Sequence, residues 1–196
     1  MNFHPLLTLG LACTLGGAFS QPALAQPKPA QLVAAGSEIV FTTKQMGVPV
    51  EGRFGSFTAQ IVLDPKKPDS GSVNFTIATG SARFGSPELD AEVPKPTWLD
   101  VAKFAQASFV SSAIKAAGPG RFDVAGKLSI KGAVRELTVP VQLQQTAGGA
   151  TSTASGSFTL KRLDFKVGEA EWADTSLLAN DIVVRFKLVL TGLAPL

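Results

Sequence analysis

The chain has 196 residues, of which 45% are hydrophobic, and its formal net charge is +3. This charge is small and its basic residues are scattered, which argues against a dedicated nucleic-acid-binding protein. No stretch after residue 25 is long and apolar enough for a membrane-spanning helix, and the length suits a single domain.

Residues 1–25 have the pattern of a cleaved secretory signal peptide. An apolar run at 6–18 is too short for a membrane span, and Ala23-Leu24-Ala25 forms a small-x-small cleavage pattern. Cleavage there removes His4 and Cys13, the only His and Cys of a sequence that has no Tyr. Histidine- or cysteine-based catalysis and thiolate or imidazole metal sites are therefore not expected in the mature chain.

The mature chain begins with a Pro- and Ala-rich segment, 26–36, that is predicted to be a flexible leader. Strands are predicted from residue 37, where Ile39 and Phe41 alternate with Glu38, Val40 and Thr42, and again over 48–63. The apolar phase shifts between Phe54 and Phe57, so Gly55 is expected to mark a bulge or bend. A further strand is expected at 73–77.

The later half of the chain is predicted to be mainly strand. Segment 97–107 is the one expected helix, because Trp98 and Val101 fall at helical spacing. After a strand at 109–115, apolar residues alternate over 121–131 and 134–145, and Gly132 between them predicts a hairpin turn. Strands at 154–161 and 182–190 follow. The fold class is therefore all-β, an antiparallel barrel of about eight strands over 37–192 that is able to enclose one small ligand.

Alternation assigns an apolar set to the inner face of this barrel. Small residues in the same set, including Gly126, are expected to leave room near the wall. These residues either fill a core or line a lumen, and periodicity leaves both possibilities open. The inward set is Phe75, Ile77, Phe122, Val124, Gly126, Leu128, Leu137, Val139, Val141, Phe158, Val184, Phe186 and Leu188.

Several short strings, taken in order, carry a family resemblance. They are Gly52-Arg53-Phe54-Gly55-Ser56-Phe57, Leu63-Asp64-Pro65, the segment 72–81, Trp98-Leu99-Asp100, the segment 103–111, the segment 126–132 and Leu160-Lys161-Arg162-Leu163-Asp164-Phe165. Together they resemble the YceI-like family of periplasmic lipid- or polyisoprenoid-binding proteins. The resemblance implies an extended, lipocalin-like barrel whose lumen takes the isoprenoid tail of a quinone or polyprenyl compound. Two positions depart from the usual pattern: Ala105, where Pro is common, and Lys166, where Gly is common.

Polar and aromatic residues are expected at the mouth of the barrel. Trp98 and Trp172 are expected either to contact a ligand or to plug the core. Arg162 is expected to form a structural ion pair with Asp164, with recognition of a quinone oxygen or phosphate as the alternative. The carboxylates around Trp172 are interpreted as a solvated loop rather than a cation site.

The resulting hypothesis is a non-catalytic periplasmic carrier that holds an isoprenoid lipid and needs no cofactor. Its expected partners are that lipid or quinone and, for hand-over, a transient contact with a membrane or membrane protein; homodimerisation stays open. Two rivals remain, a structural or interaction protein with a filled barrel and an enzyme that uses paired carboxylates such as Asp164 and Glu171.

Overall fold

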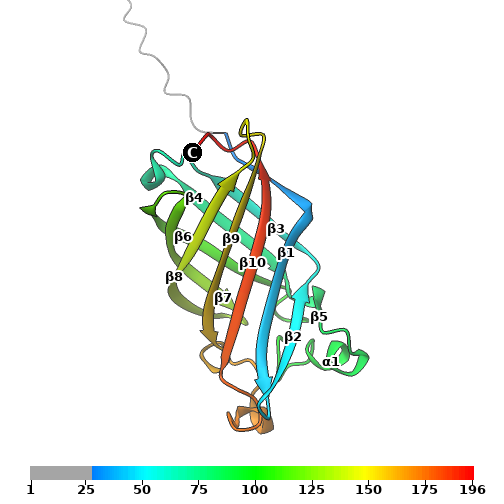
Figure 1. Ribbon diagram of the computed structural model, residues 1–196. Coiled ribbons are helices and arrows are strands. Elements are labelled where there is room, and N and C mark those ends of the chain that lie inside the picture. The colour runs from blue at the N-terminus through cyan, green and yellow to red at the C-terminus, as the bar shows by residue number, and fades with distance from the viewer. Residues whose placement is uncertain (1–27) are drawn as a thin grey trace, which may run out of the picture.

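The computed structural model describes residues 28–196, which form one curled antiparallel sheet (Figure 1). The predicted signal peptide lies outside these residues. The strands are β1 (Gln31–Gln45), β2 (Val48–Phe54), β3 (Phe57–Val62), β4 (Ser72–Ala78), β5 (Ala82–Arg83), β6 (Gln106–Gly118), β7 (Arg121–Ile130), β8 (Ala133–Gln145), β9 (Thr151–Lys161) and β10 (Asp181–Thr191). One α-helix, α1 (Pro87–Glu92), and short 3-10 segments at Pro68–Ser70, Thr79–Ser81, Arg162–Phe165 and Ala170–Ala173 accompany them.

The sheet curls so that two strands consecutive in the chain come together from its two sides. The strand order is β3-β4-β6-β7-β8-β9-β10-β1-β2-β5, so the link at 55–56 connects β3, at one end of the sheet, with β2, which is next to the short β5 at the other end. The backbone amide of Ala30 donates to the carbonyl of Ile61 at 2.7 Å, and that of Gly55 donates to Ser81 at 3.1 Å. The inward side chains are therefore enclosed in a barrel-like interior.

The hairpin of β7 and β8 has the predicted register. Phe122 lies opposite Val141 and Val124 opposite Val139, and the pair Ile130 and Ala133 closes the turn. Lys131 and Gly132 both have positive φ, 48° and 76°. Positive φ at both central residues is the geometry of a type I′ turn, whose twist matches that of the flanking strands.

The all-β antiparallel prediction is confirmed, but residues 28–196 form ten strands rather than eight. The bend expected at Gly55 is a complete break, because β2 ends at Phe54 and β3 begins at Phe57 on the far end of the sheet. β5 is a two-residue strand that pairs with the end of β2. The leader prediction for 26–36 is wrong from Gln31 onward, since β1 begins there and pairs with β10.

The prediction of a helix at 97–107 is also wrong. That segment consists of turns followed by the start of β6, and Asp100 has a φ of 49° that an α-helix does not allow. The helix lies earlier, at α1, where Pro87 follows Ser86 and acidic residues occupy the first turn. Pro at the first helical position and acids in the first turn are ordinary start signals, so this helix was detectable from the sequence.

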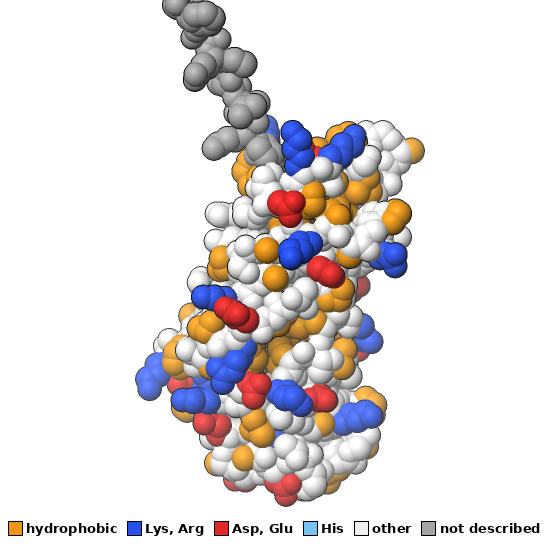
Figure 2. All heavy atoms as spheres, turned by 90° about the vertical axis from the view of Figure 1, so that its left-hand side faces the viewer, with side chains coloured by type: hydrophobic (Ala, Val, Ile, Leu, Met, Phe, Trp, Pro, Cys, Tyr) orange, Lys and Arg blue, Asp and Glu red, His pale blue; other side chains and the backbone are white. Residues whose placement is uncertain are grey.

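The outer surface carries charges of both signs in a scattered arrangement. On the face shown in Figure 2, Lys and Arg alternate with Asp and Glu, with small apolar areas between them. In the described part of the chain, no helix is long and apolar enough to cross a membrane.

Candidate functional site: an apolar cavity inside the sheet

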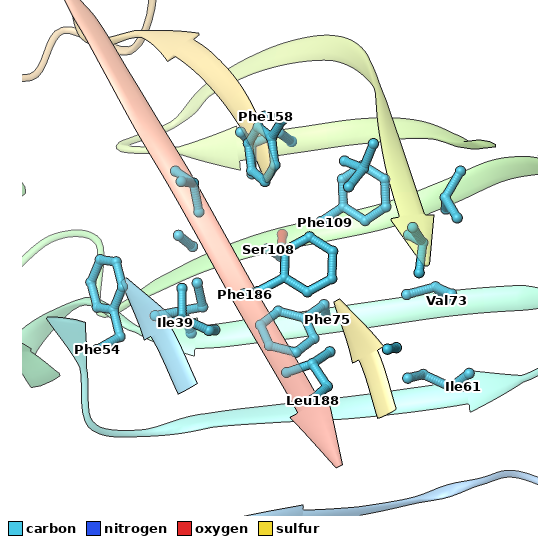
Figure 3. Close-up of a pocket in the computed structure, with 18 of the residues that line it drawn as sticks. Ile39, Phe54, Ile61, Val73, Phe75, Ser108, Phe109, Phe158, Phe186 and Leu188 are labelled. Carbon is cyan, nitrogen blue, oxygen red and sulfur yellow. The ribbon is translucent and has the colours of Figure 1, made fainter. Parts of the chain in front are cut away.

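The curled sheet encloses a cavity of about 210 Å³. Side chains from β1 to β4 and from β6 to β10 line it, and all of them are apolar except Thr79 and Ser108. Figure 3 shows the rings of Phe75, Phe109, Phe158 and Phe186 gathered in this space. Apolar cavities on the order of 150 Å³ stay dry and bind small apolar molecules. The interior is therefore neither fully packed nor wide, and a ligand of the usual pocket size, roughly 300 Å³ or more, must displace side chains to enter.

Most of the residues predicted to face inward do line the cavity. Alternation along each strand was sufficient to place them, because one face of the sheet is apolar. The lining members of the predicted set are Phe75, Ile77, Phe122, Val124, Leu128, Val139, Val141, Phe158, Val184, Phe186 and Leu188.

Gly126 and Leu137 do not line the cavity, although both were expected to. A Cβ placed on Gly126 would lie 2.5 Å from the carbonyl oxygen of Val110 and 2.6 Å from Cζ of Phe109. The ring of Phe109 therefore covers this glycine. Phe186 covers Gly156 in the same way, at 2.6 Å. The small residues make room for neighbouring aromatic rings and not directly for a ligand.

Substitution of Gly126 by Ala should therefore destabilise the protein. The added methyl group meets backbone as well as a ring, so we expect a loss of about 1–3 kcal/mol in the free energy of unfolding, typical of overpacking. Urea denaturation followed by circular dichroism measures it. Gly55→Ala is the matched control, because the nearest atom there is 3.7 Å away. Equal midpoints for the two variants would contradict the close packing around Gly126.

Several lining residues were not assigned from the sequence, including Phe109 and Ile114. These two differ in parity, so simple alternation places them on opposite faces. A bulge between Ser111 and Ala113 shifts the register of β6 against β7, and both side chains reach the interior. The odd spacing of two large apolar residues in one strand was the available signal.

Arg162 is buried and holds a loop together, which corrects its expected place at the mouth. It is 1% exposed, and it does not form the predicted ion pair with Asp164, which is exposed. Its guanidinium instead donates to five backbone carbonyls: Nε to Ala179 (3.0 Å), Nη1 to Val167 (3.0 Å) and Gly168 (2.7 Å), and Nη2 to Trp172 (2.6 Å) and Leu178 (2.7 Å). An arginine has five N–H donors, so none is left for a ligand. Burial lowers the pKa of Arg162 from its ordinary value.

The two tryptophans pack on this loop rather than in the cavity. The ring centroids of Trp98 and Trp172 lie 5.4 Å apart, and neither side chain lines the cavity. Leu99, next to Trp98, does line it. Within the segment 93–105, Leu99 is therefore the residue that lines the cavity.

Two of the acidic residues near Trp172 are engaged with neighbouring groups, and the third, Glu171, is exposed. Glu169 accepts from Lys131 Nζ at 2.9 Å. The Ser176 hydroxyl and backbone amide donate to Asp174 at 2.7 and 2.8 Å and lower the pKa of this carboxyl. Across residues 28–196, no group of three or more His, Cys, Asp or Glu residues is placed to hold a metal ion.

Comparison with known proteins identifies the family. Residues 31–190 match the YceI-like domain, from the first residue of β1 to the next-to-last residue of β10. The chain belongs to the YceI-like family. A UPF0312 protein of Shewanella baltica (strain OS185) is 28% identical over 156 residues, which cover 77% of this chain and 82% of the relative.

Solved structures of similar proteins share the YceI-like fold. Burkholderia cenocepacia BcnA is 42% identical, with a TM-score of 0.78 over 81% of this chain and 99% of BcnA. A polyisoprenoid-binding domain from Saccharophagus degradans is 14% identical, with a TM-score of 0.67 over 83% of this chain and 98% of that domain. At that identity the second comparison supports the fold alone.

Proposed function

We propose that this YceI-like protein is a non-catalytic binding protein that holds an isoprenoid lipid in its apolar cavity. The observation that carries the proposal is the cavity itself, about 210 Å³ enclosed almost entirely by aliphatic and aromatic side chains. Transfer of apolar surface out of water contributes roughly 25 cal/mol per Å², so such a space favours an apolar chain. Branched aliphatic walls interleaved with rings suit a methyl-branched chain.

The comparisons support the same ligand class. The Saccharophagus degradans domain that shares the fold is described as polyisoprenoid-binding. The match to the YceI-like domain covers every strand that contributes to the cavity. An isoprenoid quinone and a polyprenyl compound both carry the required chain.

The chemistry of the cavity favours binding over catalysis. Of the described residues that line it, only Thr79 and Ser108 carry polar side-chain atoms, and the Thr79 hydroxyl donates to the carbonyl of Phe104 at 2.7 Å. General acid–base catalysis requires a titratable group within reach of the reacting atoms. A carrier or sequestering role needs none.

The test is native mass spectrometry of the protein purified from its own periplasm, followed by organic extraction of the bound material. We expect a mature chain beginning at Gln26 that carries a stoichiometric isoprenoid. Empty protein that also fails to take up added farnesol would overturn the proposal and favour an interaction protein with a filled interior. A full-length chain recovered only from the cytoplasm would overturn the periplasmic location.

A further inference from the structure

The wall of the curled sheet is interrupted between β1 and β3. On this side, β1 pairs with β2 from Val40 to Gln45, and Ala30, the residue before β1, forms an isolated bridge with Ile61 of β3. Between these points lies the irregular stretch of β1 after Val33, where its register with β10 also shifts. Figure 1 shows β1 bending sharply there, beside β3. We use the name seam for this stretch, in which residues 31–39 of β1 lie beside residues 57–60 of β3 without forming strand pairs with them.

A second, polar cavity of about 720 Å³ lies along the seam. Ala34, Ser37 and Glu38 of β1, residues 51–57 and residues 83–85 line it. Two residues, Ile39 and Phe54, line both this groove and the apolar cavity. Figure 3 shows them side by side at one end of the apolar cavity. Two side chains therefore separate a dry interior from a polar groove that opens to the surface.

The groove carries two arginines that no acidic side chain neutralises. Arg53 and Arg83 lie directly opposite each other on β2 and β5, an arrangement of like charges that is unfavourable by itself. None of the five ion pairs among the described residues includes either arginine. Arg83 Nη1 donates to the carbonyls of Gly80 and Ala82, which holds this side chain along the strand.

The acidic residues of the groove leave an excess of positive charge. Glu51 pairs with Arg185 on β10 at 2.7 Å, so its charge is already matched from outside the groove. Glu38 is the remaining carboxylate among the lining residues. Two unmatched arginines against one unmatched glutamate leave one positive charge in the groove, which Ile39 and Phe54 separate from the apolar cavity.

We infer that the seam groove holds the polar end of the ligand, and that this end is an anion such as a phosphate on a prenyl chain. The inference rests on the proposed function, because it places the chain in the apolar cavity. That cavity offers almost no partner for a polar head group, and burial of an unpaired polar group is costly. The head must lie where the cavity meets polar surface, and the arginine pair supplies charge-assisted donors for an anion at that place.

The experiment compares farnesyl phosphate with farnesol, which share a chain and differ in the anionic end. Isothermal titration calorimetry measures both affinities for the wild type, the double variant Arg53→Gln/Arg83→Gln, and the control Arg135→Gln, an arginine of β8 whose side chain is exposed and does not line the groove. We expect the wild type to bind farnesyl phosphate at least about tenfold more tightly than farnesol, as charged hydrogen bonds predict. The double variant should lose this preference and keep its farnesol affinity, whereas the control should behave as the wild type.

The outcomes separate the inference from the proposed function. Equal affinity of the wild type for the two compounds, or an undiminished preference in the double variant, would overturn the anionic head-group site while farnesol binding still supports the lipid carrier. Binding of neither compound would overturn the proposed function itself. Inorganic phosphate that binds as tightly as farnesyl phosphate would show an ion site without connection to the cavity, which also overturns the inference.

Discussion

Replacement of Arg162 by Met is expected to lower the free energy of unfolding by at least about 3 kcal/mol, because several buried carbonyls lose a charged donor. The side chain is 1% exposed and all its donors are used on the loop between β9 and β10. Methionine fills similar space but offers no N–H group. For a domain of this size the loss corresponds to a decrease in melting temperature of roughly 6–12 °C. Differential scanning calorimetry measures it.

Two further variants separate this network from charge alone. Arg162→Lys keeps the positive charge but has three donors on a single nitrogen, so we expect it to recover less than half of the loss. Arg135→Met removes an arginine whose side chain is exposed, and its effect should stay within about 0.5 kcal/mol. If the Arg162→Met and Arg135→Met variants had the same melting temperature, the carbonyls of the loop would have to find other donors.

The strand faces of the central hairpin were predictable because the sequence alternates without interruption there. In the middle of the hairpin, cavity-lining residues of β7 meet cavity-lining residues of β8, as Phe122 meets Val141 and Val124 meets Val139. Lys131 and Gly132 then supply the one short turn that keeps this register. Period-two alternation with a two-residue turn determines both the pairing of the two strands and the face on which each side chain lies, so the contribution of this hairpin to the cavity wall followed from it.

The closure of the sheet was not predictable from local pattern. Phe54 and Phe57 are three residues apart, yet Phe57 belongs to β3 at one end of the strand order and Phe54 to β2, next to the other end. A phase shift at a glycine indicates a bulge as readily as it indicates a change of sheet edge. The seam and its groove exist only if the chain changes sheet edge at Gly55, and therefore only the three-dimensional arrangement reveals them.

The role of Arg162 was also beyond the sequence. The carbonyls that it binds lie 5 to 17 positions away along the chain, and backbone acceptors leave no trace in residue identity. Lys166 is different, because it adopts a φ of 57°. Such a conformation favours glycine, which accounts for the glycine that the family resemblance implies at this position.

Filling the cavity should abolish lipid uptake without unfolding the protein. Val139 is 7% exposed and lines the cavity from β8, whereas its neighbour Thr138 is exposed on the outer face of the same strand. We expect Val139→Trp to weaken farnesol binding more than about tenfold, since the indole occupies the space of the ligand. Thr138→Trp adds the same group on the outer face and should bind as the wild type.

Stability decides how the result is interpreted. Overpacking of a filled core costs about 1–3 kcal/mol, but part of this cost is avoided if the indole enters an existing space. A folded Val139→Trp variant without farnesol binding therefore indicates a real lumen. Ala154→Leu, a smaller addition from β9 into the same cavity, should weaken binding to a lesser degree. Farnesol binding that is unchanged in both folded variants would mean that the ligand lies outside this cavity.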